Sequence, residues 1–305
     1  MSDFFSSGWS IYIAAVTILG LIGCLVLLVI ASKAKVMAKD NSTGHVWDGD
    51  LTELNNPLPR WWMILFVLTI VVGGIYLTLY PGLGSTAGAL SWSSLGQYTA
   101  EQDHAGAAMA PIYAKYAALP AEQLAKNRDA MAIGERLFIN NCTACHGSDA
   151  KGSKGFPNLT DDDWLYGGSP EKIVETITHG RRGSMPAIAA AVGNADDVRN
   201  VANYVLSLSG SPHNEIAASA GRAKFQAICA ACHGPEGKGN QAIGAPNLTD
   251  KIWLHGWGED AIVSMVTNGK TNVMPAQEQR LTAEQIHVLG AYVWSLSHRA
   301  ESVTP

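Results

Sequence analysis

Residues 134–147 read Gly-Glu-Arg-Leu-Phe-Ile-Asn-Asn-Cys-Thr-Ala-Cys-His-Gly, and residues 221–234 read Gly-Arg-Ala-Lys-Phe-Gln-Ala-Ile-Cys-Ala-Ala-Cys-His-Gly. Both stretches hold a Gly, a Phe and a Cys-x-x-Cys-His string at the same spacing. Further matches follow in the same order: residues 157–161 with 246–250, Gly180 with Gly269, Met185-Pro186 with Met274-Pro275, and residues 204–209 with 292–297. Four blocks in one order indicate a duplicated unit.

A Cys-x-x-Cys-His string is typical of covalent attachment of a c-type haem, with the His as an axial ligand of the iron. A thioredoxin-like redox pair needs no following His, and a zinc site would need a second ligand cluster, which the sequence lacks. The sequence therefore predicts two covalently bound haems c. The attachment residues are Cys142, Cys145, Cys229 and Cys232, and the proximal ligands are His146 and His233.

Met185 and Met274 are the candidates for the sixth iron ligand. Each precedes a Pro, and they lie 39 residues after His146 and 41 residues after His233. A lone Met is usually core filler, but two Met at matched positions of a duplication favour ligation. Two other candidates, His179 and His255, match Asn268 and Tyr166 in the other repeat, so the duplication does not support them.

Each repeat also has the helices expected of a class I cytochrome c domain. We predict leading helices over residues 130–140 and 218–228, and closing helices over 198–208 and 285–296. Gly134 with Tyr204, and Gly221 with Tyr292, look like the close crossing of first and last helix in that fold. Phe138 and Phe225 would pack at the two crossings. The predicted domains span residues 126–210 and 215–300, joined by a six-residue linker, 209–214.

Two long apolar runs precede the repeats. Residues 4–32 carry no charged side chain, and residues 61–80 form a second run that opens on Trp61 and Trp62. Each is long enough to cross the roughly 30 Å hydrocarbon core. No basic residue precedes the first run, which argues against a signal peptide. We therefore predict transmembrane helices within 1–32 and 61–80, a cytoplasmic loop at 33–60 and a loose linker at 81–125.

The basic residues of the loop predict the orientation. Lys33, Lys35, Lys39 and Arg60 lie between the two runs, and no further basic residue occurs until Lys115. The positive-inside rule then places the loop in the cytoplasm. Both termini and the haem domains would lie on the periplasmic side of a bacterial inner membrane.

The net charge excludes one class of partner, and several other residues allow more than one interpretation. The net charge is −5 and no Lys/Arg-rich run occurs, so a nucleic-acid partner is not indicated. Cys24 lies alone in the first run and fits a small packed hydrophobe. Residues 161–163 are all Asp, which suits either a solvated turn or a surface that steers a basic donor protein. Arg181, Arg182 and Lys270 would pair with haem propionates or form a solvated basic loop.

With these features, the whole chain resembles the dihaem c-type cytochrome subunit (subunit III) of cbb(3)-type cytochrome c oxidases, members of the C-family of haem-copper oxidases. The more specific part of the resemblance is residues 45–62, His-Val-Trp-Asp-Gly-Asp-Leu-Thr-Glu-Leu-Asn-Asn-Pro-Leu-Pro-Arg-Trp-Trp, ahead of the second apolar run. Members of the family often have one span, whereas this chain has two apolar runs.

The resemblance implies a function and its partners. The subunit would take electrons from donor cytochromes c and pass them through a monohaem subunit to the catalytic haem-copper subunit, which reduces oxygen and pumps protons. Carried over in sequence order, Met185 would serve the haem of His146 and Met274 that of His233. The subunit itself would have no catalytic residue.

Two other functions share the paired haem motifs. A dihaem peroxidase would need one iron with an open position, against which two Met-Pro strings argue. A membrane-tethered dihaem cytochrome serving another dehydrogenase or reductase differs mainly in lacking the 45–62 segment. The sequence thus predicts an all-α protein, with two N-terminal transmembrane helices followed by two tandem class I cytochrome c domains.

Overall fold

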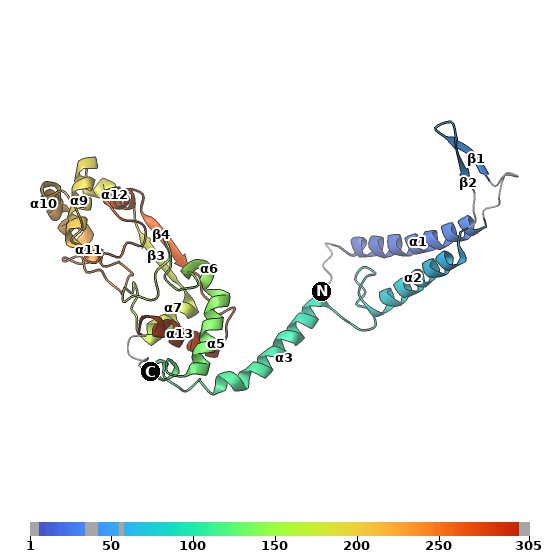
Figure 1. Cartoon of the computed structure of the whole chain (residues 1–305), viewed down its shortest axis with the longest axis horizontal. Helices are drawn as coiled ribbons and strands as arrows, with labels where there is room; N and C mark the ends of the chain where they lie inside the picture. Colours follow the sequence, from blue (N-terminus) through green and yellow to red (C-terminus); the bar gives the residue numbers. More distant parts are fainter. Residues whose placement is uncertain (1–5, 34–41, 55–57, 299–305) are drawn as a thin grey trace. The chain divides into compact units, whose positions relative to one another are not determined.

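The computed structural model describes residues 6–33, 42–54 and 58–298, and the chain divides into two compact units, residues 1–108 and 109–305 (Figure 1). The strands in the described ranges are β1 (Ser42–Trp47), β2 (Leu51–Leu54), β3 (Arg181–Met185) and β4 (Lys270–Met274). The helices are α1 (Ser7–Ser32), α2 (Arg60–Leu79), α3 (Ser94–Ala114), α4 (Ala121–Leu124), α5 (Arg128–Asn141), α6 (Thr143–His146), α7 (Pro170–His179), α8 (Ala189–Val192), α9 (Ala195–Leu208), α10 (Glu215–Lys224), the π-helical turn η1 (Phe225–Cys229), α11 (Ala230–His233), α12 (Glu259–Asn268) and α13 (Ala283–Ser297).

The first unit contains the two apolar helices. Both α1 and α2 are long and apolar enough to cross a membrane, by length and composition, and both expose most of their apolar side chains. A polar contact joins the start of α1 to the turn after α2, because the Ser85 N–H donates to Ser10 Oγ over 2.7 Å. Gly84, at φ +59°, lets the turn approach Ser10 without a side chain in between. The two predicted apolar helices are confirmed as elements.

The segment between the two apolar helices contains a β-hairpin, where only a loop was predicted. β1 and β2 pair antiparallel around a turn in which Asp48 and Gly49 both have positive φ, 48° and 87°. An Asp-Gly pair between short runs of apolar and Thr residues is a strong hairpin signal, and it could have been recognised. Lys35 and Lys39, on which the orientation partly depends, lie outside the described residues.

The predicted loose linker is wrong over residues 94–110, which form most of the 21-residue helix α3. Residues 100–110 are rich in Ala, and Ala has the highest intrinsic helix propensity. Composition suggested a flexible connection, but the Gly and Ser residues that weaken a helix are concentrated before Ser94.

The second unit holds both repeats, and their closing helices are exchanged. In the first core, α5 and α7 of the first repeat pack against α13 of the second repeat. A Cβ added at Gly134 would lie 2.5 Å from Tyr292 Cβ, so the two helix backbones approach closely there. The rings of Phe138 and Tyr292 meet with centroids 5.8 Å apart.

The second core mirrors the first. Here α9 of the first repeat packs against α10, η1 and α12 of the second repeat. A Cβ at Gly221 would lie 2.7 Å from Val201 N, and the rings of Tyr204 and Phe225 lie 5.1 Å apart. Figure 1 shows both groupings, with α13 beside α5 and α7, and α9 beside α10 and α12.

The predicted crossings of Gly134 with Tyr204 and of Gly221 with Tyr292 are therefore wrong. Gly134 meets Tyr292, and Gly221 meets the backbone of Asn200 and Val201 in α9, so each glycine lies against the closing helix of the other repeat. The elements themselves form close to their predicted positions, and the two Phe are almost fully buried as expected. Residues 126–210 and 215–300 describe the repeats along the sequence, but each packed core takes its closing helix from the other repeat.

The exchange has two physical supports. Residues 209–214 are a connection short enough to fold α9 and α10 back on each other as an antiparallel helical pair. In addition, β3 and β4 pair antiparallel, from Arg181 opposite Met274 to Met185 opposite Lys270. The segments that lead to the two closing helices therefore run alongside each other in opposite directions.

A double-mutant cycle tests this packing. Phe138→Leu and Tyr292→Leu should couple by about 0.5–1.5 kcal/mol in the free energy of unfolding, because the two rings touch. Phe138→Leu and Tyr204→Leu should be additive within about 0.3–0.5 kcal/mol, because the rings belong to different cores. The measurement is denaturant unfolding of the full-length protein. Coupling of Phe138 to Tyr204 instead would contradict the exchange.

Candidate functional site

The first Cys-x-x-Cys-His string forms a single helical turn at the end of α5. The His146 N–H donates to Cys142 O over 3.0 Å, which places both thiols and the imidazole on one turn. Gly147, at φ +77°, then ends the turn. Neither Cys142 nor Cys145 is in a disulfide.

The second string has the same ending but a different approach. η1 is a π-helical turn that leads directly into α11, and Gly234 closes it at φ +77°. A π-helical turn is rare and is frequently found at functional sites. It delivers Cys229 into the second core, where this thiol is buried while Cys232 is exposed.

The first thiol of each string is not activated for redox exchange. Burial raises the pKa of Cys142 to about 11, with a further contribution from Cys145. Burial likewise raises the pKa of Cys229. A reactive thiol of the thioredoxin type requires a lowered pKa, because the thiolate is the attacking species. The environment of both strings thus argues against a dithiol redox pair.

Both histidines are held neutral and oriented. His146 Nδ1 lies 3.0 Å from Pro157 O, and His233 Nδ1 lies 3.1 Å from Pro246 O. A carbonyl can only accept, so Nδ1 carries the hydrogen, and Nε2 keeps the lone pair that a metal requires. Burial lowers the pKa of both histidines, which keeps the ligating form at neutral pH.

Each methionine packs in the core that holds the Cys-x-x-Cys-His string of the other repeat, whereas its place in the sequence had suggested the string of its own repeat. Met274 packs against the first core, which also contacts Cys142. Met185 packs against the second core, which contains Cys229. The packing therefore favours the pairing of Met274 with the first string and of Met185 with the second. The sequence could not separate the two pairings, because the repeats carry the same local signals.

The other candidate ligands have partners elsewhere. His179 Nδ1 lies 3.3 Å from Glu278 Oε2, and His255 Nε2 lies 2.8 Å from Asn272 Nδ2.

Arg181, a candidate partner of the haem propionates, forms an ion pair with Glu175 at 2.9 Å, and its guanidinium lies over the ring of Tyr166. These contacts favour a structural role for Arg181 over a contact with propionates.

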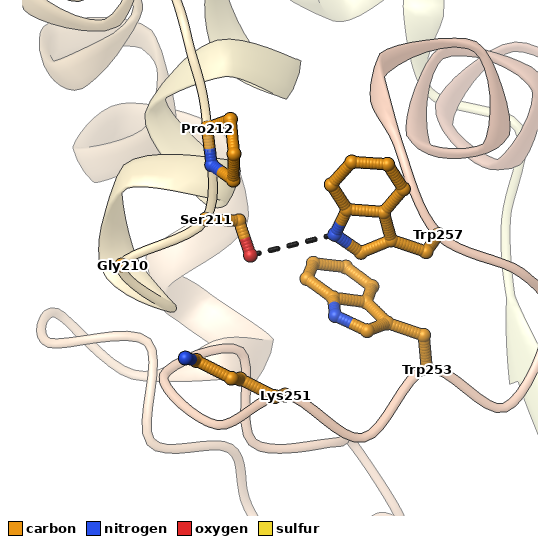
Figure 2. Close-up of a pocket in the computed structure, with 6 residues that line it drawn as sticks. All are labelled: Gly210, Ser211, Pro212, Lys251, Trp253 and Trp257. Carbon is orange, nitrogen blue, oxygen red and sulfur yellow. Dashed lines mark hydrogen bonds between the residues drawn. The ribbon is translucent and has the colours of Figure 1, made fainter.

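The side chains present fit a haem in their donor chemistry. Each Cys-x-x-Cys-His turn supplies two thiols and an imidazole, and the core beside it supplies a thioether. Among the described residues, Tyr166 O–H and Trp253 Nε1–H are buried donors without an acceptor. An unpaired buried donor costs about 1–3 kcal/mol, which an acceptor such as a propionate would offset. Figure 2 shows Trp253 beside Trp257. The Trp257 Nε1–H, unlike that of Trp253, has an acceptor, Ser211 Oγ of the linker at 3.4 Å.

Comparisons with known proteins point to one family. Residues 39–87 match the family described as the N-terminal domain of cytochrome oxidase-cbb3, FixP. Residues 129–205 and 216–293 match the family described as cytochrome c oxidase, cbb3-type, subunit III. The chain is 67% identical over 297 residues to the cbb3-type cytochrome c oxidase subunit CcoP of Rubrivivax gelatinosus, covering 97% of each chain. It is 43% identical over 273 residues to the subunit FixP of Azorhizobium caulinodans, covering 84% of this chain and 92% of that one.

The run of three aspartates is partly a structural turn. Asp161 Oδ1 accepts the N–H of Asp163 over 3.1 Å, and its counterpart Asp250 accepts the N–H of Ile252 over 2.9 Å. Burial, followed by the charges of Asp250 and Asp161, raises the pKa of Asp163 from 3.8 to about 6. Steering of a donor by this cluster stays a prediction.

The raised pKa of Asp163 predicts a pH-dependent stability. The folded state binds this proton more tightly than the unfolded chain, so the ionised form penalises folding, with no effect below pH 3.8 and the full effect above about pH 6. Asp163→Asn should raise the free energy of unfolding at pH 7.5 by about 1 kcal/mol, a value reduced to allow for solvent screening of this partly exposed group. The corresponding rise in Tm is about 2–4 °C.

Thermal unfolding at pH 7.5 and near pH 4 measures this difference. Near pH 4 the gain should largely disappear. Asp162→Asn removes the same charge from the exposed neighbour and is the matched control. An equal gain for both variants at both pH values would contradict a specific effect at Asp163.

Proposed function

The chain belongs to the CcoP/FixP family, subunit III of cbb3-type cytochrome c oxidases, and from this premise we propose that it carries electrons on two covalently attached haems c. It is a membrane-anchored electron-transfer subunit of the oxidase complex, and its partners are other subunits of that complex. The observation that carries the proposal is the pair of Cys-x-x-Cys-His turns, each with a His whose Nδ1 is held by a backbone carbonyl so that Nε2 is left to bind a metal.

Each haem would be held by one turn. Cys142 and Cys145 would attach the first haem, and Cys229 and Cys232 the second. A bound haem supplies one-electron chemistry, and the chain controls it through ligands, burial and hydrogen bonds. His146 and His233 would each present Nε2 to the iron. The aromatic and aliphatic side chains of the two cores would exclude water.

The axial methionines are proposed to be crossed between the repeats. The first haem would take His146 and Met274, and the second would take His233 and Met185. The support is that each methionine packs in the core of the other repeat's Cys turn. Thioether ligation raises the potential of the iron relative to bis-His ligation, which suits a high-potential carrier.

Donors, recipients and orientation complete the proposal. Electrons would enter from donor cytochromes c and leave through a monohaem subunit toward the catalytic haem-copper subunit. Lys33 and Arg60 lie at the facing ends of α1 and α2, and these basic residues support a cytoplasmic hairpin. The haem repeats would then lie on the periplasmic side.

One measurement addresses both electron entry and orientation. A reduced soluble cytochrome c, which cannot cross the bilayer, should reduce the haems in right-side-out membrane vesicles at a rate limited by protein encounter. In inside-out vesicles reduction should be slow, because the haems are enclosed, and detergent should restore it. Fast reduction only in inside-out vesicles would contradict the orientation. Absence of reduction in detergent would contradict the proposed electron entry.

The crossed ligation predicts which haem each methionine serves. In a variant that retains only the second haem (Cys142→Ser with Cys145→Ser), Met185→His should abolish the weak iron–sulfur band at the red end of the spectrum. It should also lower the midpoint potential, because axial ligands set potentials over a range of roughly 0.8 V. Met274→His in the same background is the matched control and should leave the band in place. The opposite result would restore sequence-order pairing.

A further inference from the structure

Two glycines end equivalent helices directly before the paired strands. Gly180 ends α7 at φ +71°, and Gly269 ends α12 at φ +66°. With ψ of −176° and −177°, both lie in a backbone region that essentially only Gly adopts, which explains by itself why Gly is favoured. The backbone conformation alone does not account for the close neighbours of the two glycines.

Each glycine lies against the Met-Pro segment of the other repeat. A Cβ at Gly180 would overlap Met274 O and lie 2.7 Å from Ala276 N. A Cβ at Gly269 would lie 2.7 Å from both Met185 O and Ala187 N. Backbone atoms cannot swing away as a long side chain can, so any side chain at either glycine must displace the methionine segment.

The β3–β4 ladder fixes these contacts in register. Arg181, which follows Gly180, is opposite Met274, and Lys270, which follows Gly269, is opposite Met185. Both methionines therefore end strands of one two-stranded ladder. Five consecutive residue pairs join the two ends of this ladder.

We propose that Gly180 is a positioning residue for Met274 and Gly269 for Met185, so that the helix-ending glycine of each repeat determines how the methionine of the other repeat meets its iron. This inference rests on the proposed methionine ligation and deepens it. The shared ladder also links the two sites, so the potentials of the two haems are set jointly rather than by each repeat alone.

The test uses Gly180→Ala and Gly269→Ala in the full-length, haem-loaded protein. Gly180→Ala should weaken the iron–sulfur band and lower the midpoint potential of the haem at His146, with a smaller shift at the haem of His233. Gly269→Ala should give the reverse distribution. Because its closest approach is 2.7 Å rather than an overlap, Gly269→Ala is the milder variant and remains informative if Gly180→Ala does not fold.

Gly210→Ala is the matched control. Gly210 also has a positive φ, +64°, but a Cβ there has nothing within 4 Å. Gly210→Ala also places a side chain at a positive φ but touches neither methionine segment, so band and potentials should be unchanged.

The outcomes distinguish the positioning role of the two glycines from the ligation of iron by the two methionines. A wild-type protein without any iron–sulfur band would mean that methionine ligation itself fails. A wild-type protein with the band, whose Gly180→Ala and Gly269→Ala variants keep unchanged bands and potentials, would overturn the positioning role. A potential shift at His233 alone in Gly180→Ala would overturn it as well. Equal shifts in Gly210→Ala would assign the effect to backbone strain in general.

Discussion

The antiparallel pairing of β3 with β4 is the contact on which the arrangement of both cores depends. It brings together two segments that lie almost ninety residues apart in the chain and that belong to different repeats. Beyond this ladder each chain segment continues into the core of the other repeat. The chain after Met274 reaches α7, where the Gln277 N–H donates to Ile177 O over 3.0 Å. The chain after Met185 reaches α12, where the Ile188 N–H donates to Val266 O over 3.0 Å.

This exchange makes one structural unit of two repeats. Neither core is complete until both repeats are present, because among the described helices α5 packs mainly against α13 and α10 mainly against α9. Residues ahead of the first repeat join the same unit. Tyr113, Tyr116 and Leu124 pack with Val288 and Ala291 of α13, and His287 Nε2 lies 2.9 Å from Leu119 O. A mutation in either closing helix therefore acts on the site of the opposite repeat.

The exchange also affects how the two haem sites can be tuned. Each proposed site combines a Cys turn and proximal His from one repeat with a methionine from the other. The environments are not identical: Tyr166 of the first repeat is matched by His255 of the second, and Gly183 lies opposite Asn272 in the ladder. Burial, with the charges of Lys270 and Lys154, lowers the pKa of His255. The approximate twofold relation between the repeats is thus broken near the ladder that joins them, which provides a physical basis for two different potentials.

The sequence alone determined the donor groups that the two candidate sites present and the existence of most elements. The apolar runs of α1 and α2, the Cys-x-x-Cys-His turns and the leading and closing helices follow from composition, periodicity and short spacing, which are local properties. The hairpin at Asp48-Gly49 had a local signal as well, and the Ala-rich part of α3 was hidden by the Gly and Ser residues ahead of it.

Only the tertiary structure decided which closing helix and which methionine complete each core. The two repeats present nearly the same Gly, Phe and Tyr to one another, so either pairing satisfies the local pattern equally well. The choice depends on chain geometry: six residues between α9 and α10 allow these helices to fold back on each other, and the β3–β4 ladder then carries both methionines across. Such a choice is a property of loop length and long-range pairing, which residue identity at any one position does not encode.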